Sequence, residues 1–239
     1  QFRLYNVDIL PEQSYFYEHN IFPLMKCKVH VSNSKLNWIR NEDNIWSTEY
    51  RLPLFNNINL KVFPKINEGK IPRFTDSIAS VTIQNCDTKD TIHIQGSEID
   101  ILYQLVKEIK KINPDFILTE DGDSFTFPYL KHRSEINQVD LILDREGIPL
   151  RRSKKDGTSY FAYGRIYFKP SAAKLFGRIH IDTYNSFVLN ESGLQGLYEL
   201  ARICRLPLHT ASRASIGKCM SSLQFYNATR NDILIPWKP

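Results

Sequence analysis

The sequence predicts an α/β protein: a mixed sheet flanked by helices, with a small β-rich domain before the sheet and a helical segment after it. Two observations indicate this class. Short runs with strand-like patterns recur between residues 57 and 182, and one long run at helical spacing interrupts them. From Gly193 onward the apolar spacing is helical. We therefore expect three parts, residues 1–56, 57–192 and 193–239.

The first part has three prolines among short, aromatic-rich runs, which is typical of a small β-rich domain. The sheet then begins with "NINLKVFPKI" (57–66), where side chains alternate as in a strand. Pro64 favours an edge strand or a bulge, because proline cannot donate to a sheet ladder. Two β-branched runs, 76–84 and 90–95, are separated by the polar turn "NCDTK" and predict a hairpin.

The clearest helix covers residues 97–112. Ser97, with an aspartate three residues later, forms a capping-box-like start, and Asn113-Pro114 ends the helix. The apolar run "DFILTE" then returns as a strand. Three acids follow at its carboxyl end, where ligands gather in open α/β sheets: Glu120, Asp121 and Asp123.

The second half of the chain alternates between short elements. One short helix is predicted over "FPYLKHRSEI", and one strand each within "YFAYGRIYFKP" and "FGRIHIDTYNSFVL". Asp156-Gly157 marks a tight hairpin turn beside four basic residues. Two helices are predicted within "GLQGLYELARICRL" and "SRASIGKCMSSLQFYNATRND".

Charge is distributed unevenly along the chain. Residues 1–130 carry 14 Lys and Arg against 17 Asp and Glu, whereas residues 131–239 carry 17 against 9. The second region is therefore the candidate for meeting a polyanion. In one predicted hairpin, cations alternate with the aromatic residues Tyr160, Phe161 and Tyr163; the cations are Arg151, Arg152, Lys154 and Lys155.

Such a ribbon can place cations against phosphates and rings against unstacked bases. The alternative is a solvated hairpin tip with ordinary strand aromatics. Arg213 and Lys218, in the helical segment, are further candidates for contacting DNA.

Other classes of protein find little support. The four cysteines lie far apart and form no C-x-x-C pair, so we expect buried thiols rather than a zinc site or disulfides. No apolar run approaches the roughly 18 residues of a membrane span, and no charged-then-apolar leader opens the chain. We therefore expect a cytoplasmic protein without membrane contact.

A resemblance to a known family rests on four segments: "YNVDILPEQSYFYEHNIFPL" (5–24), "FILTEDGDSFTFPYLKHR", "FGRIHID" and "YELARICRLPLHTASRASIGKCMSSLQFYNATRNDILIPWKP". In this order they are similar to the opening of the amino-terminal domain, the second exonuclease motif, the strand after it, and the helices leading to the palm of archaeal family-B DNA polymerases. The resemblance implies a ribonuclease-H-like mixed sheet. In active members, two metal ions bound by carboxylates activate a water that cleaves the 3′-terminal phosphodiester.

The exonuclease motifs of this family are altered here. At the first motif, D-x-E, "LKVFPKINEG" has Lys65 and Asn67 at the acid positions. At the second, N-G-D-N-F-D-x-P-Y-L, Asp121 stands at the asparagine and Thr126 at the catalytic aspartate. At the third, Y-x-x-x-D, "YELAR" (198–202) has Arg202 at the acid position. The resemblance therefore implies an exonuclease-like domain that has lost its catalytic acids.

Two other interpretations stay open. A rebuilt metal site would make the chain an active 3′–5′ exonuclease with substituted ligands, and its candidates are Glu120, Asp121, Asp123 and Asp182. Asp and Gly are also the residues that a solvated turn requires, and we expect Asp182 to cap or pair locally. The second interpretation is a polymerase-derived scaffold that binds protein partners.

No stretch resembles the palm patterns D-x-x-S-L-Y-P-S or D-T-D. We therefore expect the chain alone neither to polymerise nor to proofread, and to need no cofactor, with Mg²⁺ required by a parent DNA-directed DNA polymerase. The resemblance implies DNA as the partner, either primer–template or single-stranded, with replication proteins as further partners.

Overall fold

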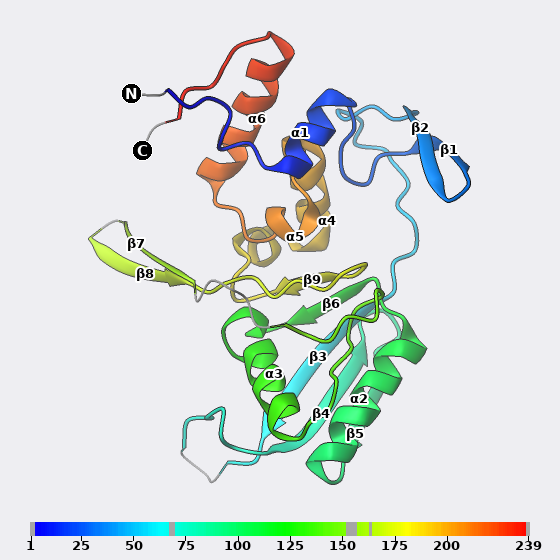
Figure 1. Ribbon diagram of the computed structural model, residues 1–239, viewed down its shortest axis with the longest axis vertical. Coiled ribbons are helices and arrows are strands. Elements are labelled where there is room, and N and C mark those ends of the chain that lie inside the picture. The colour runs from blue at the N-terminus through cyan, green and yellow to red at the C-terminus, as the bar shows by residue number, and fades with distance from the viewer. Residues whose placement is uncertain (1–2, 67–69, 152–156, 163, 238–239) are drawn as a thin grey trace. The chain divides into compact units, whose positions relative to one another are not determined.

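The computed structural model describes residues 3–66, 70–151, 157–162 and 164–237 and forms two compact units (Figure 1). One unit combines Gln1–Pro53 with Phe187–Pro239, and the other is Leu54–Ser186. The first and third expected parts therefore lie in one unit, and the boundaries fall after residues 53 and 186 instead of 56 and 192. The reason is that helices from the two ends of the chain pack on each other, which local sequence patterns do not encode.

The unit Leu54–Ser186 is built on a five-stranded mixed sheet with the order β5-β4-β3-β6-β9. An antiparallel meander consists of β3 (Asn57–Pro64), β4 (Ile78–Asn85) and β5 (Thr91–Gln95). Two parallel strands extend it, β6 (Phe116–Thr119) and β9 (Ile179–Asp182). The expected mixed sheet is confirmed.

Pro64 lies at a bulge in this sheet. The register between β3 and β4 shifts between Phe63 and Pro64, so the bulge interpretation is confirmed. The edge interpretation is wrong, because β3 is the central strand of the five. A proline is tolerated here because it stands at the last residue of the strand, where one missing N–H donor interrupts little of the ladder.

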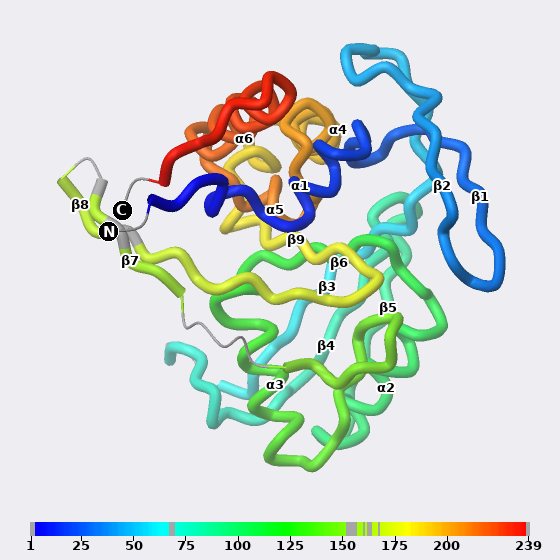
Figure 2. Tube along the Cα trace, turned by 45° about the horizontal axis from the view of Figure 1, so that its top comes forward, coloured from blue at the N-terminus to red at the C-terminus, as the bar shows by residue number. Residues whose placement is uncertain are grey.

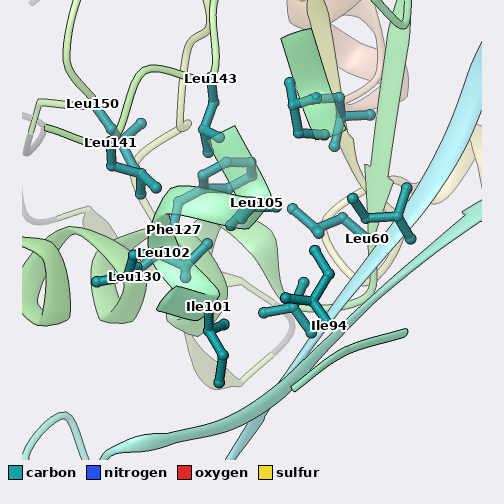
Figure 3. Packing of buried hydrophobic residues seen from close by; sticks show 14 of the residues in the cluster. Leu60, Ile94, Ile101, Leu102, Leu105, Phe127, Leu130, Leu141, Leu143 and Leu150 are labelled. Atoms are coloured by element: carbon teal, nitrogen blue, oxygen red, sulfur yellow. The ribbon is translucent and has the colours of Figure 1, made fainter. Parts of the chain in front are cut away.

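Two helices cover one face of the sheet. The first, α2 (Glu98–Ile112), begins as predicted, since Ser97 Oγ accepts the N–H of Asp100 at 3.3 Å, and it ends at Asn113 in the left-handed conformation. The second, α3 (Phe127–Ile136), follows a π-helical turn at Gly122–Thr126. Both pack apolar side chains against the same face of β3, β4 and β5, and Figure 3 shows this core.

The core leaves the opposite face of the meander polar. Leu60 and Ile94 point into the core with the leucines and isoleucines of α2 (Figure 3). Because successive strand residues point to opposite faces, Asn59, Lys61 and Gln84 lie on the other face, and each is at least partly exposed. On this face, Asn59 and Lys61 lie beside the carboxyl end of β6.

A separate hairpin in this unit consists of β7 (Thr158–Ala162) and β8 (Arg165–Lys169). The prediction that "YFAYGRIYFKP" contains a strand is confirmed, since β8 lies within it and β7 ends in it. The turn between them includes Gly164 with φ of 75°, a value that favours glycine. The predicted hairpin turn at Asp156-Gly157 and the cations Arg152, Lys154 and Lys155 fall on residues 152–156, which lie outside the described residues.

The other unit begins with α1 (Pro11–Glu18) and a hairpin of β1 (Cys27–Ser32) and β2 (Lys35–Asn41), whose strands run side by side (Figure 2). The two expected helices follow as α4 (Phe187–Cys204) and α6 (Ile216–Arg230), and a short helix that was not predicted, α5 (Leu208–Ala211), lies between them. α1 packs on α6, where Gln13 Nε2 donates to Ser222 Oγ at 2.7 Å and the hydroxyl of Tyr17 donates to the carbonyl of Ser222 at 3.1 Å. In the described part of the chain, no helix is both long and apolar enough to cross a membrane.

Candidate functional site

The carboxyl ends of β6 and β9 lie side by side, next to the middle of β3, and the acids singled out in the sequence lie there. The parallel register places Leu118 beside Asn59 and Thr119 beside Asp182. Gly122 begins the turn after β6, and only a glycine fits this position. A Cβ there would lie 2.0 Å from Thr119 Oγ1 and 2.4 Å from His180 Nε2. The loop therefore packs directly on the strand ends.

Asp182 accepts hydrogen bonds from three backbone N–H groups. Its Oδ2 accepts from Asp123 at 2.8 Å, and its Oδ1 accepts from Tyr184 at 3.0 Å and from Asn185 at 3.2 Å. The side chain is almost fully buried. The expectation that Asp182 caps or pairs locally is confirmed, because the carboxylate ties the turn after β6 to the turn after β9.

Burial raises the pKa of Asp182 above its ordinary value. The hydrogen bond from the Asp123 N–H opposes this rise, whereas the charge of the Asp123 carboxylate adds to it. Two buried carboxylates thus lie close together at the strand ends. Hydrogen bonds from backbone donors offset part of the cost of this arrangement.

Asp123 is also buried and also bonded to protein groups. Its Oδ1 accepts the N–H of Ala173 at 2.8 Å, and its Oδ2 accepts the side-chain amide of Asn185 at 2.9 Å. His180 Nδ1 lies 3.6 Å from Oδ1. Asp123 therefore fixes the segment around Ala173 to the strand ends.

His180 bridges a carbonyl and a hydroxyl. Its Nδ1 lies 3.0 Å from the carbonyl oxygen of Ala173, and its Nε2 lies 2.8 Å from Thr119 Oγ1. A carbonyl only accepts, so Nδ1 carries a proton, and a neutral ring then accepts at Nε2 from the threonine hydroxyl. The ring also packs edge-on against Phe127 with centroids 4.5 Å apart. This histidine is a packed, hydrogen-bonded core group.

The two remaining acids of the loop are paired as well. Glu120, about half exposed, forms an ion pair with Lys61 Nζ at 2.5 Å. Asp121 Oδ1 accepts the hydroxyl of Thr126, the residue at the family's catalytic aspartate. Thr126 is buried and offers a neutral hydroxyl where a carboxylate ligand is needed. Every acid of the loop thus already has a protein partner.

The strand β3 contains no acid along its whole length. Lys65 lies just after the strand, exposed, with its N–H donating to the carbonyl of Ser77 at 2.7 Å, and Asn67 lies outside the described residues. The side chain of β3 that reaches the acid loop is Lys61, which the sequence analysis did not single out. The parallel register of β3 and β6 would have identified it, but the sequence gives no local signal for that register.

A polar cavity of about 200 Å³ opens beside this pair. Its lining includes the side chains of the polar face and the strand ends: Asn59, Lys61, Gln84, Glu120 and Thr183. The residues do not fit a two-cation site, because such a site requires several free carboxylates around the ions. Among the described residues, no three His, Cys, Asp or Glu side chains gather in a metal-binding group.

The residues that matched the third motif lie in the other unit. Arg202, on α4, is fully buried and its Nη1 donates to Asp43 Oδ2 at 3.0 Å and to the carbonyl of Leu24 at 3.2 Å. Its guanidinium also stacks on the ring of Tyr50, 3.7 Å from the centroid. Arg202 thus joins α4 to residues 24–50 and has a packing role.

The basic candidates are only partly described. Arg151 is exposed, whereas Arg152, Lys154 and Lys155 lie outside the described residues. Phe161 on β7 is strongly exposed. Arg213 is largely buried, and its Nη1 donates to the carbonyl of His209 at 3.0 Å. Arg151 therefore remains a candidate, and so do the three cations outside the described residues, while the guanidinium of Arg213 is engaged within its own unit.

Comparisons with known proteins agree on one family. Residues 2–203 match the family model described as "DNA polymerase family B, exonuclease domain". A DNA polymerase of Thermococcus gorgonarius is 35% identical over 89 residues, covering 37% of this chain and 11% of that protein, and one of Pyrococcus horikoshii is 35% identical over 78 residues, covering 32% and 6%. The family B DNA polymerase of Pyrobaculum calidifontis superposes with a TM-score of 0.73 at 14% identity, over 98% of this chain and 38% of that one.

Proposed function

The chain belongs to the family B DNA polymerases, as an exonuclease-domain region, and from that premise we propose that it binds DNA and supports a polymerase core without hydrolysing the 3′ end. The chain spans only a small part of the curated relatives, 6% and 11% of the two named above. Polymerisation, and the Mg²⁺ that it requires, would therefore be functions of a parent polymerase.

One observation carries the catalytic part of this proposal: each acid at the strand ends is already bonded to a protein group. Glu120 pairs with a lysine, Asp121 with a threonine hydroxyl, and Asp123 with backbone and amide donors. A hydrolytic two-metal site needs carboxylates free to neutralise two cations. Here the same acids stabilise the loop instead.

The binding part of the proposal rests on the cations that precede β7 in the sequence and on the exposed rings of β7 and β8. Arg151 and Phe161 are exposed, and three further cations stand between them in the sequence. Cations that contact phosphates release counterions, so binding weakens with salt, and exposed rings stack on unpaired bases.

The test is a binding isotherm of the whole chain with labelled single-stranded DNA at several salt concentrations. The variant replaces Arg151, Arg152, Lys154 and Lys155 with glutamine, and the control replaces Lys107, Lys110 and Lys111 on α2. We expect the variant's slope of log affinity against log salt to fall by about 0.7 for each phosphate that it no longer binds. An unchanged slope in the variant would remove these cations from the interface, and weaker binding in the control alone would place the interface on α2.

A further inference from the structure

The hairpin of β1 and β2 has two chemically different faces. Antiparallel partners point to the same face, and the register pairs Lys28 with Arg40, His30 with Trp38, and Ser32 with Lys35. We call this side the cation–aromatic face. The opposite face presents Val29, Val31 and Leu36, each about half exposed. A two-stranded ribbon cannot bury either face by itself.

The two rings of the cation–aromatic face are held in place. His30 and Trp38 are stacked, with centroids 5.8 Å apart and planes 12° from parallel. The side-chain amide of Asn37, at the bulge where the register shifts, donates to Ser32 Oγ at 2.7 Å and lies 3.1 Å from His30 Nδ1. Trp38 is nevertheless 49% exposed. An indole fixed by its neighbours but open to solvent is a ready stacking surface.

The charge around these rings is positive. Residues 26–41 contain four cations and no acid. Lys28 pairs with Glu42 at 2.7 Å, but in the described part of the chain Lys35 and Arg40 belong to no ion pair. Lys28 and Arg40 lie on one side of the ring pair along the ribbon, two residues or about 7 Å away on a regular strand. Lys35 lies on the other side, paired with Ser32, which is two residues from His30.

We propose that the cation–aromatic face binds single-stranded DNA: Trp38 and His30 stack on an unpaired base, and Lys35 and Arg40 contact the flanking phosphates. Single strands fit better than duplex because their bases are free to stack. Exposed rings beside cations suit a polyanion that itself carries exposed rings, as single-stranded DNA does. The opposite face, with Val29, Val31 and Leu36, offers neither rings nor charge. The proposal rests on the proposed DNA-binding role and extends it to a second surface, in a different unit from β7 and β8.

The test measures binding of the whole chain to a fluorescent oligothymidylate of about 12 nucleotides, a length within the usual site sizes. We expect Trp38→Ala to weaken binding by about tenfold, in the range measured for removing one stacked ring, and Trp38→Phe to restore most of it. The matched control is Trp46→Ala, since Trp46 is 71% exposed but lies outside the hairpin. Lys35→Gln with Arg40→Gln should lower the salt slope by about 1.4, or 0.7 for each phosphate.

Three outcomes would overturn the proposal: equal effects of Trp38→Ala and Trp46→Ala, an unchanged salt slope in the double variant, or duplex DNA binding as tightly as the single strand. Circular dichroism of each variant separates weaker binding from failure to fold. If the hairpin variants bind normally while the residue 151–155 variant does not, this inference fails and the proposed function stands. The reverse result supports the hairpin and removes the other surface.

Discussion

Replacing Asp182 with alanine tests whether the buried acids are structural. The change removes the acceptor of three backbone N–H groups. The Asp123 N–H is buried, so leaving it without a partner costs about 2 kcal/mol. The other two belong to a turn in which Tyr184 is 74% exposed, so water can replace the carboxylate, and we assign them about 0.5 kcal/mol each. The expected decrease in the free energy of unfolding is about 3 kcal/mol.

The assay is chemical denaturation, with Asp87→Ala as the control for removal of an exposed acid. At about 3 °C per kcal/mol, the same decrease lowers the thermal midpoint by about 9 °C. The exposed-acid control should stay within about 0.5 kcal/mol of the parent chain. A variant at Asp182 as stable as this control would refute the structural assignment. A ligand that binds the folded state raises its stability. The structural assignment would therefore also be refuted if Mn²⁺ stabilised the parent chain but did not stabilise Asp182→Ala.

The pH dependence of this effect has a defined sign. Because folding raises the pKa of Asp182, the folded state binds its proton more tightly than the unfolded state does. Its contribution to stability is therefore full below the ordinary pKa of about 4 and declines as pH rises through the raised value. The difference in stability between the parent chain and Asp182→Ala should narrow over that range, and a difference that widened would contradict the assignment.

Three further predictions concern stability. Arg133→Met leaves Glu98 without its ion pair at 2.5 Å and should cost about 3 kcal/mol in urea unfolding. Burial alone would raise the pKa of Glu98, but hydrogen bonds from Arg133, Asn137 and the Ile78 N–H lower it overall. The stability that the Arg133–Glu98 pair contributes should therefore be full above the ordinary pKa of glutamate, and it should disappear as pH falls through the lowered pKa of Glu98. Arg202→Leu leaves the carboxylate of Asp43 unpaired and should cost about 3 kcal/mol, with a cost below about 1 kcal/mol contradicting the packing role. Gly122→Ala forces a Cβ into its neighbours and should lower the thermal midpoint by several degrees, whereas Gly217→Ala, whose Cβ would make only an ordinary 3.9 Å contact with Ser215 Oγ, should leave it unchanged or higher.

Local patterns predicted much of the sheet unit. The helix α2 was found because its cap, its apolar spacing and its stop at Asn113-Pro114 all lie within one short stretch. The strands were found because alternation has a fixed period of two. The predicted turn at Asp156-Gly157 stays a prediction, because Asp156 lies outside the described residues.

Contacts between distant segments could not be predicted. The pairing of Lys61 with Glu120 depends on the register of two parallel strands that are about 60 residues apart, and no local pattern sets that register. The two ends of the chain form one unit through hydrogen bonds between residues far apart in the sequence, Arg202 with Asp43 and Gln13 with Ser222. For the same reason the sequence pointed to acids without showing that each already has a partner.

We propose that the acids at the strand ends stabilise the fold and do not cleave DNA. The most direct test of this role incubates the purified chain in excess with a single-stranded DNA carrying a 5′ label, in Mg²⁺ or Mn²⁺, with EDTA as the control, and measures DNA length over time. We expect no shortening beyond the EDTA control. Stepwise removal of 3′ nucleotides that requires metal and disappears in Asp121→Asn would contradict it.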